Sequence, residues 1–375
     1  GYKTGASFFL LSKIVGAAAR LYLVVLILQT YVFNAWHIPF ALTAVISILL
    51  VWLYTFRSGI KTIIWTDTLQ AICLVAMLVV IIWQVKERMG LDFAGMAQTL
   101  VESPHFRLFE FSDWHSTQNF FKQFLSGIFI TIVMTGLDQD MMQKNLSCKT
   151  LRDAQKNMYT YGFAFTPVNF LFLSLGVLLL TLAGQQNIPL PELSDDILPM
   201  FCTSGLLGNT ILVFFTIGII AAAFSSADSA LTALTTSFCI DILGIEKQEA
   251  HQAKRIRLKV NVLISILFVL IILAFKAVND KSVIDAIYLI ASYTYGPLLG
   301  LFTFGLFTKR RPIDRFVPYI CVASPLLCFA LNHVAKQYAG YTFGYEMLMI
   351  NGGLTFAGLW LTSIHQPQIH TTHAH

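Results

Sequence analysis

A cluster of polar side chains interrupts a long apolar run at residues 221–234, which read AAAFSSADSALTAL. Three hydroxyls and a carboxylate stand at its centre: Ser225, Ser226, Asp228 and Ser229. Ionisable groups within a stretch long enough to cross a bilayer are costly and mark functional sites. With Ala222, the three serines follow the spacing i, i+3, i+4, i+7 and so share one face of a helix.

Hydroxyl and carbonyl oxygens along one helical face are ligands that suit a hard monovalent cation. The pattern therefore predicts a cation site, with Asp228 as a further oxygen donor close by. A second interpretation stays open. The small residues could form a seam between two helices, with each serine bonding back to the carbonyl four residues earlier.

Two more ionisable residues lie in apolar segments. Arg20, in GAAARLYLVV, keeps its charge at any physiological pH and needs an anionic or hydrogen-bonding partner when it is buried. It could hold the carboxylate of a solute or form an internal ion pair. Asp67, in IIWTDTLQ, stands among further side-chain oxygens. It could bind a cation or be a hydrogen-bonded structural residue.

Residues 291–307, ASYTYGPLLGLFTFGLF, combine a proline with helix-permissive glycines. Pro297 frees a backbone carbonyl, while Gly296 and Gly300 permit a bend, which is how transporter helices form hinges. The other interpretation is a tolerated proline kink. Tyr293 and Tyr295 could line an aqueous path or pack against neighbouring helices.

The elements that position these residues are membrane-spanning helices. Of 375 residues, 56% are hydrophobic and 12% are charged, against about 25% charged in a soluble domain. The mean hydropathy is +0.68. The chain carries no P-loop, nucleophile–base pair or metal-spaced cysteine pattern, so we expect neither an enzyme nor a metal cluster. The six cysteines stand mostly in apolar runs and are expected to be structural.

About ten apolar segments are long enough to span a bilayer. They lie at 8–33, 38–56, 62–85, 121–142, 158–183, 206–240, 258–276, 282–307, 316–334 and 343–364. Most of the 25 Lys and Arg, among them Lys13 and Lys144, fall on alternate connections. The positive-inside rule then predicts an inner-membrane protein with both chain ends in the cytoplasm. Anionic lipid accounts for the net charge of +5, so no nucleic-acid partner is expected.

The two longest polar stretches lie outside these spans. Residues 86–120 are expected to form an extracytoplasmic loop that contains a short amphipathic helix. The tail HQPQIHTTHAH holds four histidines and is expected to be a disordered polar segment rather than a metal site.

Four strings in this chain resemble the sodium:solute symporter family, in its order and spacing. They are LYTFRSGIKTIIWTDTLQ, GLDQDMMQKNLSCKTLRDAQK, GIIAAAFSSADSALTALTTSFCIDI and YTYGPLLGLFTFGLFTKR. The resemblance implies an all-α, LeuT-like inverted-repeat fold and transport of a small organic solute together with Na+. It also implies that full members begin with three further helices that this chain lacks. The chain opens GYKTGASFFLL, without Met. We therefore expect an N-terminally truncated sequence.

A single transporter domain then divides into consecutive parts. We expect the rest of the first repeat at 1–85, the extracytoplasmic loop at 86–120 and the second repeat at 121–308. The remaining residues, 309–375, would form two C-terminal helices and the tail.

The resemblance implies ligands for two sodium ions. The carbonyl of Ala222 and the hydroxyls of Ser225 and Ser226 match the family's main sodium site. Asp67 matches the acidic ligand of a second site found in some members, where Ser225 and Ser229 would complete the shell. Asp228 stands where those members can have a serine, and this departure leaves open whether it binds an ion or repels the carboxylate of Asp67.

The resemblance also bears on the solute. In the sialic-acid branch of the family, an arginine matching Arg20 grips the carboxylate of the solute. Thr131 and Met134 stand where sugar transporters have an Asn and a gating Tyr, and with Tyr293 they are the remaining candidate solute residues. An anionic, sialic-acid-like solute is favoured. A neutral or zwitterionic solute such as proline, a vitamin or a sugar is the alternative, and a transporter-like sensor module is a third interpretation.

Overall fold

The computed structural model describes residues 1–55, 60–192, 194–278 and 283–365, and these residues are overwhelmingly helical. Its first part contains α1 (Tyr2–Leu28), η1 (Gln29–Phe33), η2 (Asn34–Trp36), α2 (Phe40–Thr55), α3 (Ile60–Arg88) and α4 (Phe93–Glu102). The central part contains α5 (Phe120–Thr131), η3 (Ile132–Gly136), α6 (Gln139–Leu146), α7 (Leu151–Gln186), η4 (Ser194–Asp196) and α8 (Ile197–Thr203). The last part contains α9 (Asn209–Ser237), η5 (Phe238–Ile242), η6 (Ile245–Lys247), α10 (Ala250–Val278), α11 (Val283–Phe307), α12 (Val317–Ala339) and α13 (Met347–Leu361).

One small sheet departs from the all-α expectation. Strands β1 (Arg310–Pro312) and β2 (Ser363–His365) pair antiparallel, with Arg311 opposite Ile364. The pairing joins the ends of α11 and α13, which already pack side by side. Two short connections that run past each other can satisfy their backbone groups in this way.

Every predicted apolar segment overlaps a helix. Among the described residues, six helices are long and apolar enough to cross a membrane, and seven if one bent pair counts as a single span. Two shorter apolar helices cover Phe40–Leu53 and Met347–Leu361. The multi-pass character is thus confirmed, while the number of ten crossings stays a prediction.

The segment expected to span the membrane at 121–142 is a bent pair of helices in the structure. α5 runs into the π-helix η3, and α6 leaves at 60° after a break. The sequence Gly136-Leu137-Asp138 explains the break, because the Asp138 carboxylate accepts from the backbone N–H of Asp140 and so begins a new helix. This bend places α6 beside α9.

Two apolar cores hold the helices that carry the polar residues. The first surrounds the middle of α1, where Ala17, Ala18 and Ala19 are at most 1% exposed and α9, α10 and α11 pack closely. The second joins α3, α7, α8 and α9 around Leu78, Leu178 and Phe201. α9 belongs to both cores, so its central turns are fixed from two sides.

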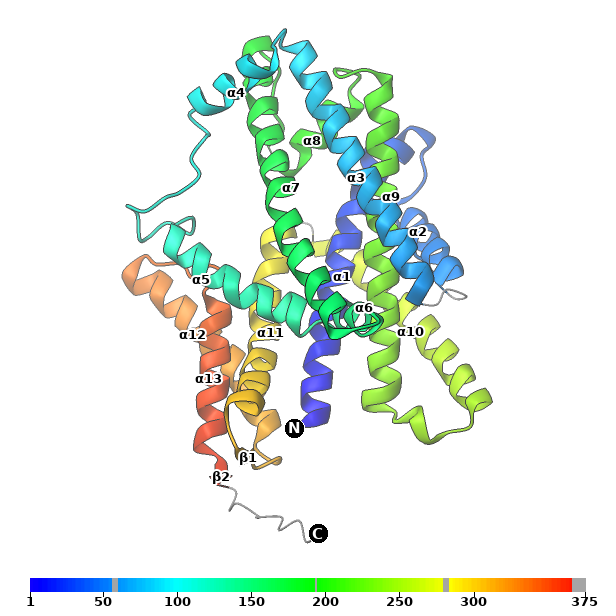
Figure 1. Ribbon diagram of the computed structural model, residues 1–375, viewed down its shortest axis with the longest axis vertical. Helices are drawn as coiled ribbons and strands as arrows, with labels where there is room; N and C mark the ends of the chain where they lie inside the picture. The colour runs from blue at the N-terminus through cyan, green and yellow to red at the C-terminus, as the bar shows by residue number, and fades with distance from the viewer. Residues whose placement is uncertain (56–59, 193, 279–282, 366–375) are drawn as a thin grey trace.

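Several connections gather at two opposite ends of the molecule (Figure 1). The N-terminus, the α9–α10 connection and the β1–β2 pair share one end, whereas the α3–α4 and α7–α8 connections share the other. The assignment of basic connections to the cytoplasmic side stays a prediction. α4 confirms the helix expected within 86–120, and its placement at a membrane surface stays a prediction.

The remaining sequence expectations concern cysteines and the tail. All six cysteines are free, and Cys202, Cys239, Cys321 and Cys328 are buried, while their structural role stays a prediction. The histidine-rich tail beyond residue 365 lies outside the described residues.

Candidate cation and solute site

The helices α3 and α9 bring together the two acidic strings singled out in the sequence. Gly218 of α9 lies against Met77 of α3, and a Cβ at Gly218 would stand 2.5 Å from the Met77 sulfur. Seven residues further along α9, the Ser225 hydroxyl donates a hydrogen bond to Oδ1 of Asp67. The two contacts follow the chain in opposite directions, so α3 and α9 run antiparallel and hold Asp67 beside the serine cluster.

A lysine lies at the centre of this cluster. The Nζ of Lys144, on α6, is 2.6 Å from Oδ2 of Asp67 and 3.0 Å from Oδ2 of Asp140. It also donates to the Ser229 hydroxyl over 3.4 Å. An ammonium has three donors, and here each one has an oxygen acceptor. Sequence reasoning placed Lys144 on a basic connection between two spans, and the structure shows instead that it belongs to the short helix α6 and that its ammonium lies in this cluster.

Asp228 completes the cluster without a hydrogen bond of its own. Its side chain is 1% exposed, and neither carboxylate oxygen has a hydrogen-bond partner among the described residues. The neighbouring Thr55 hydroxyl donates instead to the Val51 carbonyl. Asp228 is close enough to Asp67, Asp140 and Lys144 to interact with all three electrostatically. Buried and unpaired carboxylates are rare because their desolvation is costly.

The face expected for the main sodium ion lies within one continuous helix. Ala222, Ser225 and Ser226 all fall on consecutive turns of α9 and are half-buried. Because the Ser225 proton points to Asp67, the oxygen lone pairs of this hydroxyl stay available. The arrangement can therefore offer two hydroxyl oxygens and one carbonyl lone pair to a cation.

Arg20 lies in α1 directly after the buried alanines, and its own side chain is exposed. Its Nε donates to the carbonyl of Gly16 over 3.2 Å. Among the described residues, no carboxylate lies within ion-pair distance of the guanidinium. Arg20 does lie near Tyr295 of α11. Tyr295 in turn lines a small cavity with Met134 and Val133 of η3.

The two tyrosines of α11 differ in their neighbours. Tyr295 connects Arg20 with Met134, whereas the ring of Tyr293 packs on Phe329 of α12 with centroids 6.4 Å apart. Residues two apart on a helix point to different sides, which explains the difference. Thr131 ends α5 with an exposed side chain. Of the four candidate solute residues, the structure therefore links Arg20 and Met134. The link is Tyr295, whereas the candidate chosen from the sequence was Tyr293.

A buried ion pair between α1 and the start of α6 lies close to Tyr295. The Lys13 ammonium of α1 lies 2.5 Å from Oδ2 of Asp138, and both side chains are less than a tenth exposed. Lys13 was expected to be a loop residue, and instead it connects α1 to the start of α6. Losing one partner of such a pair leaves an uncompensated charge in the interior.

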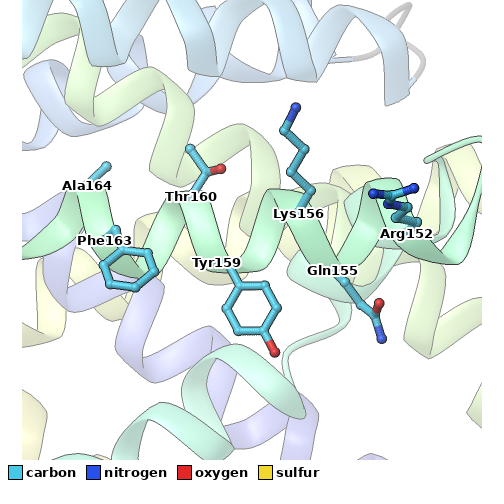
Figure 2. Close-up of a pocket in the computed structure, with 7 residues that line it drawn as sticks. All are labelled: Arg152, Gln155, Lys156, Tyr159, Thr160, Phe163 and Ala164. Carbon is cyan, nitrogen blue, oxygen red and sulfur yellow. The ribbon is translucent and has the colours of Figure 1, made fainter.

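A larger hollow elsewhere does not have the character of a binding site. Figure 2 shows its seven lining side chains, all on α7, with Tyr159 and Phe163 pointing to one side of the helix and Lys156 and Thr160 to the other. Tyr159 and Phe163 are 71% and 80% exposed. No second helix supplies converging polar groups, so this is an open helix flank with basic and aromatic residues.

A model of the sodium:solute symporter family matches residues 10–312, most of the chain. The chain belongs to this family. It is 25% identical over 325 residues to the sodium/sialic acid symporter SiaT of Proteus mirabilis, covering 84% of this chain and 64% of that protein. It is 26% identical over 365 residues to the sodium/sialic acid symporter NanT of Aliivibrio fischeri, covering 94% and 70%.

Two further proteins are similar to this member of the family. The sodium-dependent multivitamin transporter of Oryctolagus cuniculus is 26% identical over 276 residues, which cover 68% of this chain and 41% of that protein. A solved structure of a Na+-coupled sialic acid symporter, substrate-bound and outward-open, superposes with a TM-score of 0.77 at 21% identity. That match covers 97% of this chain and 75% of the other. The likeness confirms the expected LeuT-like fold. The chain thus spans about two thirds of the length of the sialic acid symporters it matches.

Proposed function

We propose that this protein is a secondary transporter that takes up a carboxylate-bearing, sialic-acid-like solute together with sodium. The oxygen face of α9, held in place by the contact between Ser225 and Asp67, carries the sodium part of the proposal. Hydroxyl and carbonyl oxygens replace the hydration shell of a hard cation at little cost. The two sialic acid symporters among the similar proteins support the same class of solute.

Arg20 carries the solute part of the proposal. Its guanidinium is exposed and donates a hydrogen bond to the carbonyl of Gly16 on its own helix. Among the described residues, no carboxylate forms an ion pair with it. A guanidinium binds a carboxylate with two parallel hydrogen bonds, which gives both orientation and affinity. Tyr295 lies near Arg20, and Met134 lines a small cavity with Tyr295, so these two side chains would contact the rest of the solute.

Coupling follows from linkage between the two sites. Sodium on α9 would favour the helix packing in which the solute site is complete, and the solute would raise sodium affinity by the same factor. The sodium gradient and the membrane potential then drive uptake, since moving one charge through about 100 mV supplies about 2.3 kcal/mol. We further propose that the protein lies in the cell's inner membrane with both chain ends in the cytoplasm.

Uptake of labelled sialic acid into proteoliposomes tests the function. We expect uptake in sodium but not in potassium, and its loss in Ser226→Ala. Thr216→Ala is the matched control, because Thr216 is a hydroxyl residue of the same helix that bonds to its own Leu212 carbonyl. Uptake that does not depend on sodium would contradict the proposal.

The role of Arg20 needs a second pair of variants. We expect Arg20→Ala to weaken the apparent affinity for the anionic solute by at least about tenfold, since a charged bidentate contact contributes on the order of 1.5–3 kcal/mol. Arg88→Ala, at the exposed end of α3, should leave it unchanged. Unchanged affinity in Arg20→Ala would favour a neutral or zwitterionic solute, the alternative to which the likeness to a multivitamin transporter lends support.

A further inference from the structure

The groups expected to bind a second sodium ion already surround a cation of the protein itself. The expected ligands were Asp67, Ser225 and Ser229, with Asp228 as a further candidate. In the structure, Asp67 and Ser229 both contact the Lys144 ammonium, at 2.6 Å and 3.4 Å, while Ser225 donates to the other oxygen of Asp67. Asp67, Ser225 and Ser229 are therefore engaged, and Asp140 adds a further carboxylate at 3.0 Å, while Asp228 lies close by without a hydrogen bond.

The charges of the cluster explain why a cation belongs there. Asp67, Asp140 and Asp228 bring three carboxylates into mutual electrostatic range, and Asp228 is almost fully buried without a hydrogen bond. Like charges at such distances repel strongly where water is scarce. Lys144 is itself only 22% exposed, and its ammonium is the positive charge that the described residues place among them.

The lysine reaches this position because of two local features. Asp140 and Lys144 stand four residues apart on α6, so both project from the same side of that helix. The bend after η3 then directs α6 toward α3 and α9, which carry the remaining partners. The ammonium thus joins three helices at one point.

We propose that Lys144 is a tethered cation that takes the place of a second sodium ion, so that transport is coupled to one sodium only. This inference rests on the proposed function, because it concerns the stoichiometry of sodium coupling. A lysine side chain cannot dissociate and be carried across the membrane, so it supplies the charge of an ion without being transported. The site on Ala222, Ser225 and Ser226 remains for the ion that moves.

The count of bound sodium ions tests the inference directly. With the full chain in lipid nanodiscs, equilibrium dialysis with radioactive sodium should give one ion per chain. Stabilisation against heat by sodium should follow a Hill coefficient of about 1. Two ions per wild-type chain would overturn the inference and leave the proposed function intact. Binding of no sodium at all would instead overturn the proposed function.

Variants of the lysine provide the second test. Lys144→Gln removes the charge and keeps a polar side chain, and we expect a second sodium to bind, raising the Hill coefficient toward about 2. Lys144→Arg keeps the charge and should bind one ion. Adding Asp67→Asn to Lys144→Gln should return the count to one.

Two results would contradict the role of Lys144 in these variants. One is a folded Lys144→Gln that still binds a single sodium. The other is a Lys144→Arg that binds two. If Lys144→Gln does not fold, the double variant Lys144→Gln/Asp67→Asn removes one charge of each sign and so keeps the charge of the cluster balanced. The number of sodium ions bound by the wild-type chain then still tests the inference.

Discussion

Ser225 connects the two parts of the cation cluster at the scale of single residues. Its proton is donated to Asp67, so its lone pairs face away from that carboxylate. The same contact that anchors Asp67 thereby orients Ser225 as an oxygen ligand. A serine at this position has two roles, and neither is visible from its neighbours in sequence alone.

A prediction about Asp228 belongs to the same scale. Because its carboxylate is buried, unpaired and close to two other acids, Asp228→Asn should stabilise the protein. We expect the free energy of unfolding to rise by about 1 kcal/mol, because the amide carries no charge that would repel Asp67 and Asp140. Thermal unfolding in detergent without sodium measures it.

A control variant separates this effect from a general change in charge. Glu192→Gln removes one negative charge from an exposed position outside the helices and should leave the unfolding temperature unchanged. A lower unfolding temperature in Asp228→Asn would show instead that the Asp228 charge is needed to hold Lys144.

At the scale of elements, the glycines Gly296 and Gly300 of α11 lie in close contact with α13. α11 runs without interruption through Pro297. A Cβ at Gly296 would stand 2.2 Å from Nδ2 of Asn351 in α13, and that amide donates to the carbonyl of Tyr293 over 2.9 Å. The amide partner and the absent side chain let α11 and α13 approach closely along these turns. A rocking motion of α11 would have to carry α13 with it.

Gly300 provides the element-scale prediction. A Cβ there would stand 2.5 Å from Cβ of Thr355 and 2.7 Å from the carbonyl oxygen of Gly352, which is backbone and cannot move aside. We expect Gly300→Ala to lower the free energy of unfolding by about 1–3 kcal/mol, as overpacked cores do. Thermal unfolding of the purified chain measures the change.

The same helix offers a matched control. Gly305 also lies in α11, but a Cβ there would meet no atom within 4 Å. Gly305→Ala should therefore be neutral or stabilise the protein by up to about 1 kcal/mol, because alanine is the better helix former. Equal destabilisation by both substitutions would argue against tight contact between α11 and α13.

At the scale of the whole molecule, the described helices form a bundle with several of its connections gathered at two opposite ends (Figure 1). Large apolar side chains such as Leu263, Leu270 and Leu326 are more than half exposed on the outer helices. In water such surfaces would cause association, while in lipid they meet hydrocarbon. The outer surface is thus suited to a bilayer, while polar groups such as Asp228 and Ser229 lie in the interior.

This arrangement predicts which connections face the cytoplasm. Gln248 lies in the α9–α10 connection, just before the basic first turns of α10, and Gln118 lies in the connection before α5; both side chains are exposed. In right-side-out vesicles, we expect a membrane-impermeant maleimide to label Gln118→Cys directly but Gln248→Cys only after permeabilisation. The unsubstituted chain provides the background from its own cysteines. Labelling in the reverse order would overturn the predicted orientation.

The sequence was sufficient for features that depend on neighbouring residues. Apolar runs of bilayer length located the helices, and a spacing of three and four placed Ala222, Ser225 and Ser226 on one face of α9. The positions of Gly136 and Asp138 also contained the signal for the bend before α6, which the apolar run at 124–134 obscured. Such features are local because hydropathy and helical periodicity act within a few turns.

Only the tertiary structure decided which charges meet. Lys144 and Ser229 are 85 residues apart, and Lys13 and Asp138 are 125 apart, so neither spacing nor charge pattern could pair them. The choice between Tyr293 and Tyr295 likewise depended on how α11 is rotated against η3 and α12. By itself, the sequence determined that oxygens suited to a cation lie on α9. The packing of α3, α6 and α9 placed an ammonium among them, because the energy of a charge depends on its neighbours in space.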